Sequence, residues 1–259
     1  MLRLNKRLIL FLFFSVTLAV CVFLQAALAS GNIGKLSESS FFDSNNLYVV
    51  GEVVNTGDVA IQNVNVKVLF YNSSNEKIAS IEGHTDLNVI LPGRKSFYSI
   101  RLLESEGALS VVNHTTWFNW TEIPAGKPLG LVILSRNDSV DVDGHKHVSG
   151  QIQNQGIVDS VNTEVSATFY NSTGTVVGTS WVFSNPSTLS PNQTGTFDLE
   201  LVYTQQVSKV ASYGLTAESG ALAFSPAPLI PEFPSGILAL LLMVPLLVGA
   251  VFLGKKVKG

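Results

Sequence analysis

The chain has 259 residues, of which 16 are basic, 19 are acidic and one is a cysteine, and its net charge is −3. The stretch from Ser30 to Pro231 holds ten basic and eighteen acidic residues, a net charge of −8. This excess argues against nucleic acid as a partner, because phosphate binding needs clustered Lys and Arg. Cys21 lies in an N-terminal apolar stretch, so the region after it has no thiol for a disulfide, an iron–sulfur cluster or catalysis.

Residues 1–29 are predicted to be a secretory signal peptide. Arg3, Lys6 and Arg7 precede an apolar stretch over residues 8–24, and small residues lead to an expected cut after Ala29. The apolar stretch is longer than is usual in such signals, so an uncleaved signal anchor is the alternative interpretation.

One pattern occurs twice in the middle of the chain, with a constant offset of 99 residues and no gap. The matching pairs are Val49 and Val148, Gly51 and Gly150, Asn55 and Asn154, Gly57 and Gly156, Asn63 and Asn162, Val66 and Val165, Phe70 and Phe169, Pro92 and Pro191, and Leu102 and Leu201. The repeat predicts two domains, over residues 35–125 and 130–222, joined by a short segment with two prolines.

Each copy is predicted to be β structure, because apolar and polar residues alternate along it. The inward positions are Val64, Val66, Val68 and Phe70 in the first copy, and Thr163, Val165, Ala167, Phe169, Phe197, Leu199 and Leu201 in the second. The residues between them, including Ser166 and Thr168, are expected to face solvent. Short strands separated by turns at about every 8–12 residues predict an all-β fold of two tandem immunoglobulin-like antiparallel β-sandwiches.

Both copies resemble the FxLyD-type domain, an immunoglobulin-like β-sandwich of secreted and membrane-attached prokaryotic proteins. The residues that carry the resemblance are Gly51, Asn55, Gly57, Phe70, Tyr71 and Pro92, then Gly150, Asn154, Gly156, Phe169, Tyr170, Pro191 and Phe197. The acidic residue usual after the aromatic pair is replaced by Asn72 and Asn171. These are turn and core positions, so the resemblance bears on the fold and says little about function.

The segment "SVDVDGHKHV" is the one stretch of the sequence that suggests a metal site. Asp141 and Asp143 fit part of a calcium-loop pattern, although Gly150 stands where that loop has its bidentate Glu. His145 and His147 alternate along a strand, so they would share a face as two metal ligands do. The alternative is a β-turn that leads into an edge strand, with no ion bound.

Six N-x-S/T sequons occur, and four of them are glycosylation candidates: Asn72, Asn137, Asn171 and Asn192. Asn72 and Asn171 occupy the same predicted turn of the two copies. The alternative is that Asn and Ser are simply good turn formers. In "TTWFNW", the alternation places Trp117 and Phe118 on opposite faces, which leaves at least one large ring near the surface or the domain junction.

The chain ends in a stalk, an apolar run and a basic tail. Residues 223–235 contain four prolines and are expected to form an extended stalk. Residues 236–254 are predicted to be a transmembrane helix, since an uncharged run of 18 residues spans about 27 Å. A buried core helix is the alternative. The lysines in 255–259 predict a cytoplasmic end, which leaves the bulk of the chain extracellular.

The end of the stalk resembles the PEF-type C-terminal sorting signal of archaeal surface proteins. Pro231, Glu232, Phe233 and Pro234 carry the resemblance. It implies an archaeosortase-type transpeptidase as a partner, which cuts near the motif and transfers the chain to a lipid. An ordinary proline-rich stalk before a retained helix is the alternative.

Together these features predict a non-enzymatic, membrane-anchored cell-surface protein. Two immunoglobulin-like domains would serve interaction or structural roles in the envelope, with another surface protein or a glycan as partner. No nucleophile, zinc-protease or phosphate-loop motif occurs, and we expect no cofactor. The alternative is an extracytoplasmic solute- or metal-binding accessory protein.

Overall fold

The computed structural model describes residues 30–123 and 130–221. These residues lie in the first of two compact units of the chain, Met1–Ala223. The predicted signal peptide (1–29), membrane helix (236–254), basic tail (255–259) and sorting motif lie outside them, as does the stalk (223–235). Within the described ranges, no helix is both long enough and apolar enough to cross a membrane.

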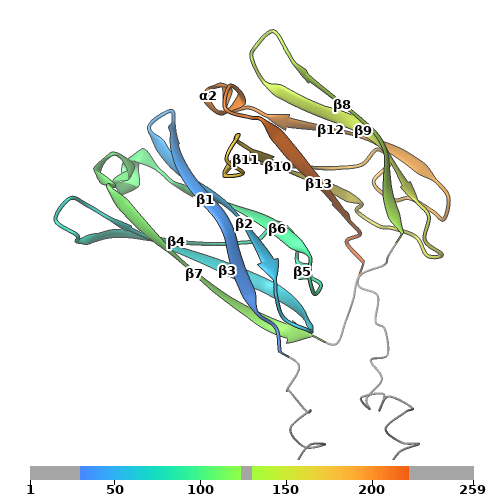
Figure 1. Ribbon diagram of the computed structural model, residues 1–259, viewed down its shortest axis with the longest axis horizontal. Coiled ribbons are helices and arrows are strands. Elements are labelled where there is room, and N and C mark those ends of the chain that lie inside the picture. The colour runs from blue at the N-terminus through green and yellow to red at the C-terminus, as the bar shows by residue number, and fades with distance from the viewer. Residues whose placement is uncertain (1–29, 124–129, 222–259) are drawn as a thin grey trace, which may run out of the picture. The chain divides into compact units, whose positions relative to one another are not determined.

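The first repeat consists of two antiparallel sheets (Figure 1). One sheet has the order β1-β2-β6, with β1 at Ile33–Asp43, β2 at Asn46–Asn55 and β6 at Lys95–Leu102. The other has the order β4-β3-β5, and β7 also pairs with β3. Its strands are β3 (Ala60–Tyr71), β4 (Lys77–His84), β5 (Val89–Ile90) and β7 (Asn113–Ile123). Two 3₁₀ turns, η1 (Glu104–Glu106) and η2 (Ala108–Ser110), precede β7.

The second repeat has the same two-sheet construction. One sheet has the order β12-β9-β8, with β8 at Leu131–Val140, β9 at Lys146–Asn154 and β12 at Thr194–Leu201. The other has the order β11-β10-β13, with β10 at Glu164–Tyr170, β11 at Val176–Phe183 and β13 at Ser212–Glu218. A single helical turn, α2 (Thr204–Val207), precedes β13. The predicted all-β, sandwich-like fold is confirmed, while the domain boundaries at 35–125 and 130–222 stay a prediction.

Each repeat has a hydrophobic core of its own, and the predicted inward positions lie in it. In β3, Val64, Val66, Val68 and Phe70 are at most 1% exposed. Thr163, just before β10, is buried in the same way. So are the inward positions of β10 and β12, which are Val165, Ala167, Phe169, Phe197, Leu199 and Leu201. Burial of these side chains is the main term that stabilises each sandwich, since no disulfide is available to it.

The expectation that Ser166 and Thr168 face solvent is wrong, because both are buried. The Ser166 hydroxyl donates a hydrogen bond to the carboxyl group of Asp86, which belongs to the first repeat. The strand is therefore covered on both faces. One face packs into its own core, and the other contacts the neighbouring repeat.

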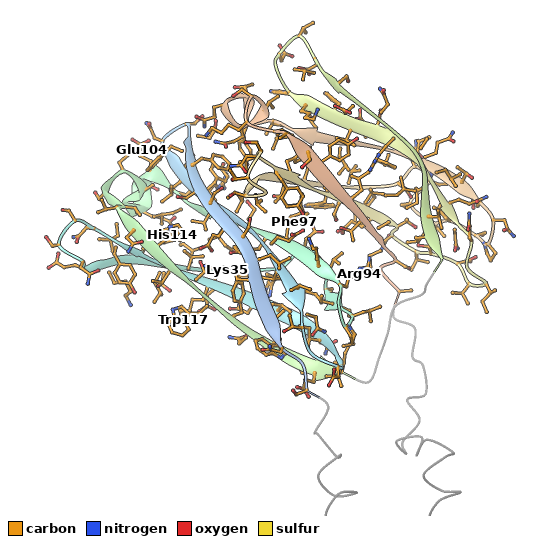
Figure 2. All side chains as sticks on the ribbon, in the orientation of Figure 1. Lys35, Arg94, Phe97, Glu104, His114 and Trp117 are labelled. Carbon is orange, nitrogen blue, oxygen red and sulfur yellow. The ribbon has the colours of Figure 1, made fainter. Side chains whose placement is uncertain are left out.

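The contact between the repeats combines an apolar cluster with polar bonds. Phe41, Tyr48 and Val50 of the first repeat form a buried cluster with Val176, and Tyr203 packs against it. The Tyr170 hydroxyl donates to a Glu52 carboxylate oxygen at 2.5 Å. Arg94, labelled in Figure 2, lies 3.6 Å from a Glu218 oxygen and donates to the Ala217 carbonyl.

Candidate metal site on the second repeat

The turn between β8 and β9 holds Asp141 in a fixed orientation. One carboxylate oxygen of Asp141, Oδ1, accepts the backbone N–H groups of Asp143 at 3.0 Å and His145 at 2.8 Å. Gly144 adopts a positive φ of 84°, which lets the chain turn back within these residues. The second oxygen, Oδ2, lies 3.4 Å from Nε2 of His147. The turn thus directs one carboxylate oxygen at an imidazole.

The other acidic partners come from β12, on the far side of β9. His147 pairs directly with Glu200 in the β9–β12 register and with Ser139 in the β8–β9 register. Its neighbour Val148 is buried in the core, so His147 lies on the outer face of the sheet. The alternative prediction was a β-turn that leads into an edge strand. The edge strand is wrong, because β9 is the central strand of its sheet, as Figure 1 shows.

Each histidine faces a carboxylate of β12. Nδ1 of His145 lies 2.6 Å from Oε1 of Glu200, and 3.8 Å from Oδ2 of Asp141. Nδ1 of His147 lies 3.2 Å from both carboxylate oxygens of Asp198. We call these five residues, Asp141, His145, His147, Asp198 and Glu200, the histidine–carboxylate cluster.

Two residues of the cluster, His147 and Asp141, have shifted pKa values. The hydrogen bond to Asp198 is the main cause that raises the pKa of His147 above its ordinary value, and the bond to Asp141 adds to it. The backbone N–H of His145 is the main cause that lowers the pKa of Asp141. All these groups are reached by solvent, so these pairings are worth little as stabilising ion pairs.

The structure brings together three of the four residues predicted for this site. Asp141, His145 and His147 converge, whereas Asp143 is exposed and contributes its backbone N–H. Asp198 and Glu200 were not predicted, because they lie about 50 residues further along and only the register of β12 on β9 brings them near. Their alternation in "TFDLEL" was visible, but the sequence does not say which strand lies beside them. The set is mixed nitrogen and oxygen rather than the all-oxygen set of a calcium loop.

The sequon residues differ in how the structure presents them. Oδ1 of Asn72 accepts the backbone N–H of Glu76 at 3.0 Å, and Oδ1 of Asn171 accepts that of Thr175 at 2.9 Å. The predicted equivalence of these two turns is thus seen in matching hydrogen bonds. Asn137 and Asn192 are exposed, in β8 and in a turn. Glycosylation of all four stays a prediction.

Two tryptophan side chains of the described residues are exposed outside the cluster. Trp117 is 64% exposed on β7, while Phe118 packs against the first core. Figure 2 shows Trp117 at the outer side of β7. Trp181 is 52% exposed and lines an open cleft of about 390 Å³ together with His84 and Asp86.

A second polar network lies inside the first repeat, around Glu38 of β1. Its carboxylate accepts the hydroxyls of Tyr98 and Thr116 at 2.5 Å each, and Lys35 donates to it at 2.8 Å. His114 is 3.4 Å away. Burial alone would raise the pKa of Glu38, but these partners together hold it well below its usual range. Every oxygen of Glu38 is engaged, which makes this network structural.

The comparisons with known proteins do not assign this chain to a family. No family model matches it, and no curated protein matches it. Among solved structures, the exo-chitosanase CsxA of Amycolatopsis orientalis is 12% identical, with a TM-score of 0.27 over 71% of this chain. Red sea bream transglutaminase is 10% identical, with a TM-score of 0.24 over 74%. The matches cover 26% and 29% of those proteins, and such low scores carry no argument about activity.

Proposed function

We propose that this chain is a non-enzymatic surface protein, anchored in the cell membrane, that displays two β-sandwich repeats outside the cell. The observation that carries the proposal is the order of its parts. Two cysteine-free repeats with a strongly acidic balance stand between two apolar segments, each flanked by basic residues. Basic flanks of membrane segments remain in the cytoplasm, so the region between them is exported.

The packing of the repeats supports an interaction or structural role. Both cores are filled by side chains of the facing sheets. In the first repeat, the polar network around Glu38 joins neighbouring strands. The apolar cluster around Tyr48 and Val176 joins one repeat to the other. Such an arrangement suits a protein that presents its outer faces and loops to a partner.

Membrane attachment is proposed to follow the PEF-type route. On this proposal an archaeosortase-type transpeptidase reads Pro231, Glu232, Phe233 and Pro234 and exchanges the C-terminal helix for a lipid. Glycans at the exposed sequons would then enlarge the solvent-facing surface, with Asn137 and Asn192 the most accessible of the four.

Protease treatment of intact cells tests the proposed location. We expect peptides from residues 30–221 to be released from whole cells, while a cytoplasmic marker protein stays intact. The proposal fails if these residues are cut only after the cells are lysed. The intact mass of the native protein then shows whether the chain is cleaved after Ala29, whether its C-terminus is processed, and whether it carries glycans.

A further inference from the structure

We propose that Asp141, His147 and Glu200 bind one divalent transition-metal ion of the zinc class on the outer face of the second repeat. Each of the three side chains offers one ligand atom, and these atoms lie within 4.8 Å of one another. They come from two separate parts of the repeat, the β8–β9 turn with β9 and the strand β12. The inference goes beyond the surface role and does not depend on it.

The spacing of the donors suits a small ion. Bonds of about 2.1 Å at tetrahedral angles place neighbouring ligand atoms about 3.4 Å apart. Oδ2 of Asp141 lies 3.4 Å from Nε2 of His147, which matches this separation between neighbouring ligand atoms. Glu200 is 41% exposed, so it can complete the triangle by a side-chain rotation without moving the backbone.

The surroundings of His147 are those of a metal-binding imidazole. Such a histidine usually donates the N–H of its other nitrogen to a carboxylate, which fixes the tautomer and aims the free nitrogen at the metal. Asp198 lies 3.2 Å from Nδ1 and leaves Nε2 directed at Asp141. We therefore assign Asp198 as a positioning residue. Nδ1 of His145 lies 2.6 Å from Oε1 of Glu200 and 3.8 Å from Oδ2 of Asp141, so this imidazole is next to both carboxylates of the proposed site.

The first repeat provides an independent observation, because the same sandwich is built there without any of these side chains. At the offset of 99 residues, the five cluster positions are occupied by Phe42, Asn46, Tyr48, Ser99 and Arg101. Tyr48 is buried against the second repeat, and an arginine stands where Glu200 would be. The sandwich therefore forms without the cluster, and the five converging polar side chains are particular to the second repeat.

The donor types select the class of ion. Imidazole nitrogen with carboxylate oxygen suits Zn²⁺ and Cu²⁺. Ca²⁺ needs six to eight oxygen ligands. The three carboxylates have six oxygens, but Oδ1 of Asp141 accepts two backbone N–H groups and both oxygens of Asp198 face His147. We expect Zn²⁺ and Cu²⁺ to bind and Ca²⁺ to bind at least 100-fold more weakly.

The test uses the full chain in detergent, purified without a histidine tag and stripped with a chelator. Zn²⁺, Cu²⁺ and Ca²⁺ are titrated as their chlorides, by calorimetry and in competition with a coloured zinc chelator. We expect one Zn²⁺ per chain in the wild type. H147A and E200Q should each abolish stoichiometric binding, and D198N should weaken it by about 10–100-fold, as loss of an orienting partner does.

Asp143→Asn is the matched control, since it removes a carboxylate from the same turn but outside the cluster, and it should bind Zn²⁺ like the wild type. Imidazole NMR signals identify the nitrogen that loses its proton, and Nε2 of His147 is expected to shift on Zn²⁺ addition. Near-ultraviolet circular dichroism verifies that each variant is folded. The proposal is overturned if folded H147A and E200Q bind Zn²⁺ like the wild type, if no Zn²⁺ binds, or if Ca²⁺ binds more tightly.

Discussion

Asn55 and Asn154 make the same three side-chain hydrogen bonds in the two repeats. Each donates through Nδ2 to the carbonyls found four and 35 residues later, at 2.7–2.8 Å, and each accepts through Oδ1 the N–H of the glycine two residues later, at 2.9 Å. Both side chains are buried. The repeated asparagine therefore ties the end of β2 or β9 to the turn that follows it and to a segment 35 residues further along.

Replacing Asn55 or Asn154 by alanine is expected to destabilise its repeat. Two carbonyls and one N–H would lose their partner. Because a hydrogen bond contributes about 0.5–1.5 kcal/mol net, the three lost bonds should cost about 2–4 kcal/mol in total. Urea unfolding of each variant measures it. Asn88→Ala, at an exposed position, should change the free energy of unfolding by less than about 0.5 kcal/mol. If the Asn55 and Asn154 variants also lose less than about 0.5 kcal/mol, these asparagines do not stabilise the repeats through their buried hydrogen bonds.

Gly51 and Gly150 are expected to reject a methyl group. A Cβ on Gly51 would lie 2.3 Å from the Tyr98 hydroxyl, and one on Gly150 would lie 2.1 Å from the Ser135 carbonyl. Forcing these groups apart should cost about 1–3 kcal/mol in each alanine variant, measured by thermal or urea unfolding. Gly214→Ala is the control, because its nearest neighbour lies 3.6 Å away, in ordinary contact. Equal stability of all three variants would show that the β-sheet relaxes freely there.

Stability should fall as the pH rises from about 4 to about 8, because of Asp86. Burial first, and the charge of Glu164 second, raise the pKa of Asp86 to about 8. In that pH range the folded chain keeps a proton that the unfolded chain has lost, so deprotonation favours unfolding. Above about pH 8 both states are ionised and this contribution is constant.

The variant Asp86→Asn tests this assignment, because the amide cannot ionise. Between pH 5 and pH 8 the wild type should lose on the order of 3–4 kcal/mol relative to the variant, measured by urea unfolding at each pH. Asp159→Asn is the control at an exposed carboxylate, and its pH profile should parallel that of the wild type. Parallel profiles for Asp86→Asn would mean that Asp86 is ionised in the folded chain.

The strands and the repeat were predictable because their signals are local. Period-two alternation at Val64, Val66 and Val68 reports a half-buried strand without knowledge of its neighbours. The burial of Ser166 was not predictable, since it depends on Asp86 from the other repeat. Packing between segments that are distant in the sequence decides which faces of a sandwich remain exposed to solvent.

The candidate site shows the same division. The turn at Asp141 and the shared face of His145 and His147 follow from spacing within ten residues. The contribution of Asp198 and Glu200 depends on the pairing of β12 with β9, a relation between strands about 50 residues apart. Sequence alternation says which side chains share a face but not which strand lies beside them.

Glu38 is expected to hold the two sheets of the first repeat together at neutral pH. It lies on β1 of one sheet and bonds to Thr116 on β7 of the other, with Tyr98 of β6 as a further donor. Glu38→Gln keeps the shape but removes the charge, so we expect a loss of about 2 kcal/mol at pH 7. Because the pKa of Glu38 is lowered in the folded chain, its contribution to the free energy of unfolding is complete above about pH 4.5 and is lost as the pH falls further.

The difference in the free energy of unfolding between wild type and Glu38→Gln, measured by urea unfolding at pH 7, 5 and 3, should therefore narrow at pH 3. Glu104→Gln, at the exposed residue labelled in Figure 2, should show no such gap. A gap that stays constant down to pH 3 would mean that the variant acts through packing instead of charge.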